Sequence, residues 1–189
     1  MTASGTPRLF VGLVPDEALR ASLHATASAH LDSRDWRLVA AADLHLTLCF
    51  IGALEASRVP DLCAALHAEL AGARAPELTL RGFGCVGEPA APRVLWVGVS
   101  AGPAQLALLL ELRRHTGRAL ARVAIAWDAG GPFNPHITVA RPRRHRPLPA
   151  EFAAARFEST WRPAKVVLMT SIPGADPHYR ALEAVALES

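Results

Sequence analysis

The tetrapeptide HLTL at residues 45–48 has a near copy, HITV at residues 136–139, about half the chain further on. Each copy places a histidine and a threonine two positions apart within an apolar run that favours a β-strand. One such tetrapeptide would mean little, but residue type and spacing both recur, which indicates an internal duplication. The sequence therefore predicts two similar halves, each contributing one of these strands.

Strand geometry places the polar residues of each copy together. Successive side chains of a strand point to opposite faces, so His45 and Thr47 share one face, as do His136 and Thr138. The apolar residues between them form the opposite, buried face, which we expect to include Phe50 in the first strand. Bringing the two strands together would surround one small space with two imidazoles and two hydroxyls.

These side chains suit phosphodiester chemistry. A histidine has an unperturbed pKa near 6.5, so at neutral pH one imidazole can accept a proton while the other donates one. Two threonine hydroxyls can donate hydrogen bonds to the non-bridging oxygens of a phosphate. Neither tetrapeptide contains Asp or Glu, the ligands of a two-metal site, so we expect hydrolysis without a metal or other cofactor.

The rest of the sequence repeats the order strand, helix, strands. Strands are predicted over 8–14 and 93–99, each followed by a helix, of which the second spans 103 to about 125. The segment 84–92 is rich in Gly and Pro, and we interpret it as a loop or lobe boundary. The expected fold is α+β, with two pseudo-symmetric lobes, each an antiparallel sheet with helices packed outside, and an active-site cleft between them. We expect residues 1–189 to form a single two-lobed domain.

The composition excludes several classes of protein. The 189 residues are 51% hydrophobic and 20% charged, so the chain can bury a core and is not disordered overall. There is no long apolar stretch of the kind that spans a membrane, and no apolar segment typical of a secretory signal. Cys49, Cys63 and Cys85 lack metal-site spacing and are interpreted as small buried residues in a reducing compartment. We therefore expect a cytoplasmic monomer that does not bind membranes.

A basic run follows the second tetrapeptide directly. It contains Arg141, Arg143, Arg144 and Arg146, in a chain whose 20 basic residues include 19 arginines. A guanidinium grips phosphate with two hydrogen bonds, so the run either contacts a nucleic-acid backbone or is a solvated loop. On an ideal strand Arg141 points away from His136, so a bend or the end of the strand must bring it to the same face.

These segments resemble the two-histidine phosphoesterase superfamily, and specifically the RNA 2′,3′-cyclic phosphodiesterase family, also named 2′-5′ RNA ligase. That family is marked by two H-x-T-x motifs. Flanking segments also resemble the family's most recognisable blocks, at 8–16, 43–52, 93–99, 133–141 and 166–174, the last followed by Tyr179. In 84–92 an aromatic residue often seen in relatives is not apparent, which leaves base recognition open.

The resemblance implies an activity and a role for each candidate residue. It implies hydrolysis of a 2′,3′-cyclic phosphate at an RNA end, or of a cyclic nucleotide, to a 2′-phosphomonoester. It makes His45 the general acid that protonates the leaving O3′ and His136 the general base that activates water. Thr47 and Thr138 would hold the phosphate oxygens, and Arg141 would contact phosphate or ribose. Ligation of a 2′-5′ bond would be the same reaction in reverse, as a secondary activity.

Two alternatives remain at this point. The chain could be an RNA-binding module that keeps the fold, although a binder needs no pair of proton-transfer groups. It could also be a phosphodiesterase acting on another small cyclic phosphate, such as ADP-ribose cyclic phosphate. The remaining histidines have no partner at ligand spacing and are interpreted as ordinary helix or loop residues: His24, His30, His67, His115, His145 and His178.

Overall fold

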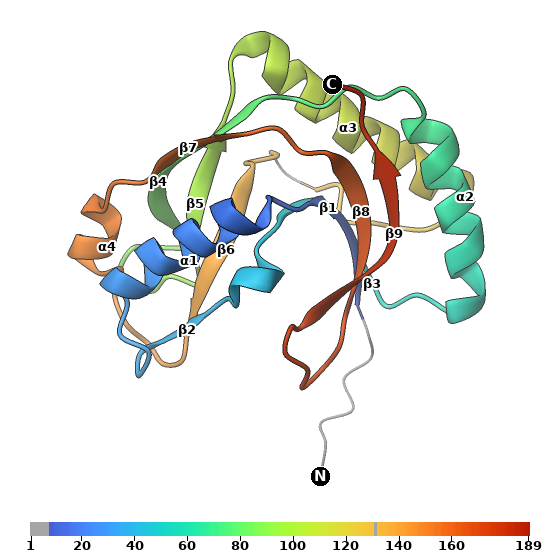
Figure 1. Ribbon diagram of the computed structural model, residues 1–189. Helices are drawn as coiled ribbons and strands as arrows, with labels where there is room; N and C mark the ends of the chain where they lie inside the picture. The colour runs from blue at the N-terminus through green and yellow to red at the C-terminus, as the bar shows by residue number, and fades with distance from the viewer. Residues whose placement is uncertain (1–7, 131) are drawn as a thin grey trace.

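Nine strands form one curled antiparallel sheet in the computed structural model, which describes residues 8–130 and 132–189 (Figure 1). The strand order is β7-β4-β5-β6-β3-β1-β8-β9, with β2 paired to the free side of β6. The helices and strands follow one another as β1 (Leu9–Leu13), α1 (Glu17–His30), β2 (Trp36–Leu38), β3 (Leu46–Gly52), α2 (Val59–Leu70), β4 (Leu78–Val86), β5 (Val94–Ser100), α3 (Pro103–Arg122), β6 (His136–Pro142), α4 (Ala150–Ala154), β7 (Glu158–Trp161), β8 (Lys165–Ser171) and β9 (Tyr179–Ala186).

The two strands that carry the tetrapeptides lie side by side in the middle of this sheet. They meet through one register pair, Leu46 opposite Ile137, which are the second residues of the two tetrapeptides. Because equivalent positions face each other across an antiparallel pair, a local pseudo-twofold axis passes between them. The predicted α+β fold with two similar halves is confirmed, with one refinement: the two antiparallel sheets are joined edge to edge into a single curved sheet.

Each of the two long helices packs against the half of the sheet that does not contain the strand before it. Helix α1, which follows β1, packs against β2 and β6 of the other half, whereas α3, which follows β5, packs against β3 and α2 (Figure 1). The side chain of Asp16 caps α1 by accepting a hydrogen bond of 2.8 Å from the Leu19 amide. Helix α3 continues through Gly117, where a Cβ atom would lie 2.8 Å from the Trp127 ring, so the glycine makes room for the indole.

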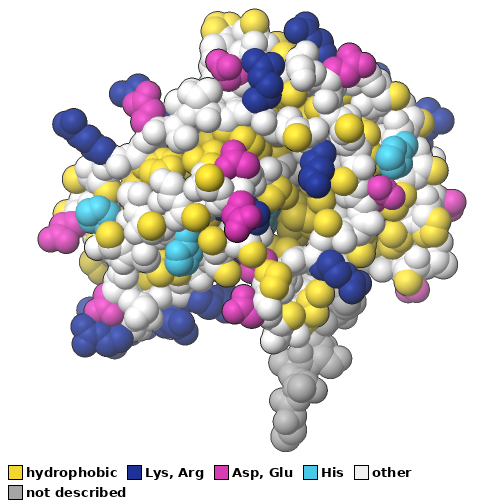
Figure 2. All heavy atoms as spheres, in the orientation of Figure 1, with side chains coloured by type: hydrophobic (Ala, Val, Ile, Leu, Met, Phe, Trp, Pro, Cys, Tyr) yellow, Lys and Arg dark blue, Asp and Glu magenta, His cyan; other side chains and the backbone are white. Residues whose placement is uncertain are grey.

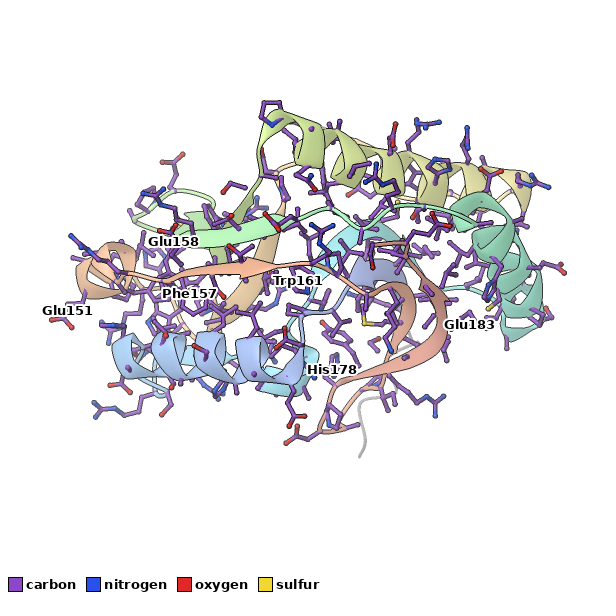
Figure 3. The ribbon with its side chains drawn as sticks, turned by 45° about the horizontal axis from the view of Figure 1, so that its top comes forward. Glu151, Phe157, Glu158, Trp161, His178 and Glu183 are labelled. Carbon is purple, nitrogen blue, oxygen red and sulfur yellow. The ribbon has the colours of Figure 1, made fainter. Side chains whose placement is uncertain are left out.

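The structure differs from the sequence prediction in two places. The segment 84–92 is not wholly a loop, because β4 continues to Val86. Gly84 allows this, since a Cβ there would lie 2.6 Å from the Trp96 ring on the neighbouring strand. The short elements α4 and β7 were not predicted; Phe152 of α4, Trp161 of β7 and Phe157 just before β7 lie in the core (Figure 3).

A continuous apolar core lies behind the central strands. Leu46, Leu48, Ile137 and Val139 are all buried in it, which fixes the orientation of the polar side chains on the opposite face. The three cysteines are free; Cys49 is buried as expected, whereas Cys63 and Cys85 are only half-buried. None of the helices in the described part of the chain has the length and hydropathy that a membrane span requires.

Candidate active site

A β-bulge interrupts β3 at the last residue of its tetrapeptide. Val11 pairs with Cys49 and Gly12 with Thr47, so Leu48 is an extra residue relative to β1. Leu48 and Cys49 are therefore both buried, and the alternation of faces resumes one residue later. The prediction that Phe50 belongs to the apolar face is wrong: the bulge turns it outward, where it is 43% exposed.

The same bulge occurs at the equivalent position of β6. Trp96 pairs with Thr138 and Leu95 with Ala140, so Val139 is the extra residue and both Val139 and Ala140 are buried. Arg141 consequently returns to the face that carries Thr138. This is the bend that the sequence required to bring Arg141 round. A bulge three residues after each histidine thus belongs to both halves.

The histidines and threonines of the two tetrapeptides share the concave face of the sheet. Because Leu46 lies opposite Ile137, the flanking His45 comes opposite Thr138, and Thr47 opposite His136. A cavity of about 620 Å³ is lined by His45, Thr47 and Thr138. His136 lines a second cavity of about 700 Å³, and both cavities share Thr47 and Phe50. The two cavities therefore form one cleft with a histidine in each half.

Both imidazoles are held in the same way. The Nδ1 atom of His45 lies 2.7 Å from the backbone oxygen of Asp43, and the Nδ1 atom of His136 lies 2.8 Å from the backbone oxygen of Asn134. A carbonyl oxygen can only accept, so each Nδ1 carries the hydrogen. The Nε2 atom of each ring is then the one available for proton transfer.

The surroundings of the two rings differ. His45 stacks on Phe10 with ring centroids 4.5 Å apart and meets the edge of Tyr179 at 5.0 Å. The pKa of His45 is lowered to about 4, chiefly because the ring is buried; the charges of His136 and Arg141 also lower it, and the hydrogen bond to Asp43 opposes the shift. His45 is therefore neutral at pH 7 in the free protein.

An aromatic residue accompanies each histidine from the adjacent strand. Trp96 on β5 lies 6.3 Å from His136, as Phe10 on β1 lies beside His45. Both aromatics precede a glycine by two positions, in the runs FVG at 10–12 and WVG at 96–98. This parallel was visible in the sequence and could have identified both residues. The aromatic rings thus form part of the duplicated unit.

Asp43 connects His45 to the segment at the start of β9. Its buried carboxylate accepts hydrogen bonds of 2.9 Å from the backbone amides of His178 and Tyr179, while its carbonyl oxygen holds His45. His178 lies in the segment between β8 and β9 (Figure 3), as predicted, and it also lines the first cavity, which the sequence did not indicate. No local pattern marks Asp43 or His178, because their contacts join distant segments.

The basic run divides between the cleft and the outer surface. Arg141 lines the first cavity. Arg144 and Arg146 instead form ion pairs with Asp35, at 3.3 Å for Arg146, and the Nε of Arg143 donates to the backbone oxygen of Ser33. Dark blue side chains accordingly gather at the lower left of Figure 2, beneath β2.

Comparison with known proteins places the chain. The model of the 2′-5′ RNA ligase superfamily matches residues 14–172, a range that contains both tetrapeptides. The chain belongs to this superfamily. It is 33% identical over 185 residues to the RNA 2′,3′-cyclic phosphodiesterase of Thermus thermophilus, across 95% of this chain and 90% of that protein.

A further sequence relative and a solved structure extend the comparison. An RNA 2′,3′-cyclic phosphodiesterase of Geobacillus stearothermophilus is 39% identical over 115 residues, which are 61% of this chain but only 34% of that protein. The crystal structure of TT0787 from Thermus thermophilus superposes with a TM-score of 0.73 and 29% identity, covering 96% of this chain and 98% of that one. The overall fold of this chain is thus similar to that of a solved structure along almost its whole length.

The cleft of this superfamily member brings two imidazoles and two threonine side chains together. Nε2 of each ring is the atom left for proton transfer, and the side chains of Thr47 and Thr138 line the same cleft. Among the residues that the structure describes, no three His, Cys, Asp or Glu side chains are grouped so that they could hold a metal ion. The arrangement favours general acid–base catalysis on a phosphate ester.

Proposed function

We propose that this protein hydrolyses the 2′,3′-cyclic phosphate at the 3′ end of RNA to a 2′-phosphomonoester. The observation that carries the proposal is the pair of equivalent histidines, each with its Nε2 free, on the two central strands of one cleft. The superfamily membership and the names of the relatives, RNA 2′,3′-cyclic phosphodiesterases, support the same activity. We expect the protein to act on RNA as a cytoplasmic monomer.

The reaction would proceed by in-line displacement at phosphorus. His136 takes a proton from water through Nε2, and the water oxygen bonds to phosphorus on the side away from O3′. The bond between phosphorus and O3′ breaks, and O3′ takes the proton from Nε2 of His45. The hydroxyls of Thr47 and Thr138 donate to the two non-bridging oxygens, where negative charge is held throughout. The product keeps its phosphate on O2′.

The low pKa of His45 bears directly on its role as the acid. Burial makes the protonated ring scarce in the free protein at pH 7 but also makes it a strong proton donor once it forms. A phosphate anion bound beside the ring stabilises the imidazolium, because an opposite charge at short range favours the charged form. Substrate binding would therefore prepare His45 to protonate O3′.

The test is hydrolysis of a short RNA that ends in a 2′,3′-cyclic phosphate, with identification of the product isomer. We expect a 2′-phosphate, activity that persists in a chelator, and losses of roughly 10² to 10⁴ in kcat for His45→Ala or His136→Ala. The variant His145→Ala, on the exposed loop after β6, should keep full activity. A 3′-phosphate product would reverse which oxygen leaves, and loss of activity in chelator would exclude the mechanism.

A binding module is the contrasting hypothesis. It requires RNA affinity that survives replacement of both His45 and His136 while no cyclic phosphate is hydrolysed. Hydrolysis of small cyclic phosphates but not of RNA ends would instead favour the other phosphodiesterase hypothesis. The duplicated histidines with matching hydrogen bonds favour catalysis, because a binding surface does not need two oriented proton-transfer groups.

A further inference from the structure

Strands β2 and β6 place two arginines directly opposite each other at one end of the cleft. Arg37 is the register partner of Arg141 in this antiparallel pair, and both are exposed. Directly opposite residues point to the same face, and Arg141 lines the cavity that holds His45. The neighbouring Trp36 is buried, so Arg37 points away from the core, toward the cleft face.

This pair of like charges makes an unfavourable contribution to the stability of the fold. Like charges directly opposite each other on neighbouring strands destabilise a sheet. Acidic residues are available close by, but Asp32 pairs with Arg34 and Asp35 pairs with two arginines of the loop after β6. Within the described part of the chain, no carboxylate forms an ion pair with Arg37 or Arg141. Two unneutralised guanidiniums side by side are suited to bind an anion.

The position of the pair relative to the histidines suggests which anion. The bulge makes Arg141 the next cleft-facing side chain after Thr138, about two strand steps of roughly 3.3 Å each along β6. This separation is comparable to that between consecutive phosphates of a nucleotide chain. The arginine pair also lies in the His45 half of the cleft, where the ribose carrying the leaving O3′ would be.

We propose that Arg37 and Arg141 bind a second phosphate, the one on the 5′ oxygen of the nucleotide whose cyclic phosphate reacts. This proposal rests on the proposed function and narrows its substrate class. The preferred substrate is an RNA 3′ end or a 5′-phosphorylated nucleoside 2′,3′-cyclic phosphate, because each carries this phosphate. A nucleoside 2′,3′-cyclic phosphate without a 5′-phosphate leaves the two guanidiniums without a partner.

The first experiment compares two small substrates, adenosine 2′,3′-cyclic phosphate and the same compound with a 5′-phosphate. For the wild-type protein we expect the phosphorylated compound to have a kcat/KM roughly tenfold or more higher, as charge-assisted hydrogen bonds imply. Arg37→Gln should bring this ratio close to one, and Arg37→Lys should restore part of it. The matched control Arg34→Gln removes the same charge from an outer arginine and should keep the wild-type ratio.

The second experiment measures binding without turnover. By calorimetry, the wild-type protein should bind adenosine 2′,5′-bisphosphate roughly tenfold more tightly than adenosine 2′-phosphate, and Arg37→Gln should abolish the difference. Equal affinities in the wild type would overturn the proposal, as would an Arg37→Gln variant that weakens both compounds equally. If neither cyclic phosphate is hydrolysed but the bisphosphate binds more tightly, the proposed function is wrong and the second phosphate site stands.

Discussion

Burial of the His45 ring predicts a specific loss of stability in mild acid. The pKa of His45 falls from 6.5 to about 4 on folding, chiefly because the ring is desolvated beneath Phe10 and Tyr179. Between these two values the unfolded chain binds a proton at His45 that the folded protein does not. Protonation of the unfolded chain at His45 therefore lowers the free energy of unfolding as the pH falls from 6.5 toward 4. Above pH 6.5 the ring is neutral in both states, and this loss of stability is absent. A shift of this size corresponds to about 3 kcal/mol.

The variant His45→Gln isolates this contribution. Urea unfolding at pH 7, 5.5 and 4, followed by tryptophan fluorescence, gives the free energy of unfolding of both proteins. We expect the wild-type value minus the variant value to fall by about 3 kcal/mol between pH 7 and pH 4. His145→Gln on the exposed loop serves as the matched control for loss of an imidazole. An NMR titration of the wild type should give His45 a pKa near 4.

The result that would refute the reasoning is equally specific. If the difference between wild type and His45→Gln is the same at pH 7 and pH 4, the folded and unfolded states bind protons at His45 alike. The ring would then be hydrated in the folded protein despite its contacts with Phe10 and Tyr179. The free protein would hold His45 partly protonated near neutral pH, and substrate binding would not be needed to charge it.

Two other substitutions test how the central strands are held. Gly12→Ala should destabilise the protein by about 3 kcal/mol in urea unfolding. The added Cβ would lie 2.5 Å from the backbone oxygen of Leu46, which cannot easily move. A loss below about 0.5 kcal/mol would show that the strands separate readily. Asp43→Ala should cost roughly 1–3 kcal/mol, because two backbone N–H groups at the start of β9, those of His178 and Tyr179, lose their acceptor. Asp43→Asn retains one side-chain oxygen and should lose less; equal losses would mean that these hydrogen bonds contribute little.

The duplicated tetrapeptides carried most of what could be predicted from sequence. A period of two places His45 beside Thr47 without knowledge of any partner strand, and repetition of the pattern implies that the halves meet. The bulges could not be predicted, because the residues from 44 to 50 alternate as an ideal strand would. Their position depends on pairing with β1 and β5, which local sequence does not encode. Phe50 was misplaced for this reason.

Residues that act across long sequence separations were missed for a different reason. Asp43 meets the amides of His178 and Tyr179 only after β9 has docked beside β8. Arg37 acquires its partner Arg141 only when β2 pairs with β6. In both cases the residue is unremarkable in its own segment, and its significance comes from tertiary pairing. Sequence repetition could identify the aromatic residues beside the histidines but not these contacts.

We expect the differences between the two halves of the cleft to orient the substrate. Phe50 and Arg141 occupy equivalent positions, five residues after their histidines and just past equivalent bulges, yet one is apolar and the other cationic. Arg141 and Arg8 line the cavity of the His45 half, whereas the cavity of the His136 half is lined by Arg113 together with Asp128, so we expect an anionic nucleotide chain to be drawn toward the His45 end. The ribose and its O3′ would then lie next to His45, and water would approach from the His136 side. Equivalent hydrogen bonds orient both imidazoles for proton transfer, and we expect their unequal neighbours to decide which one meets the leaving oxygen.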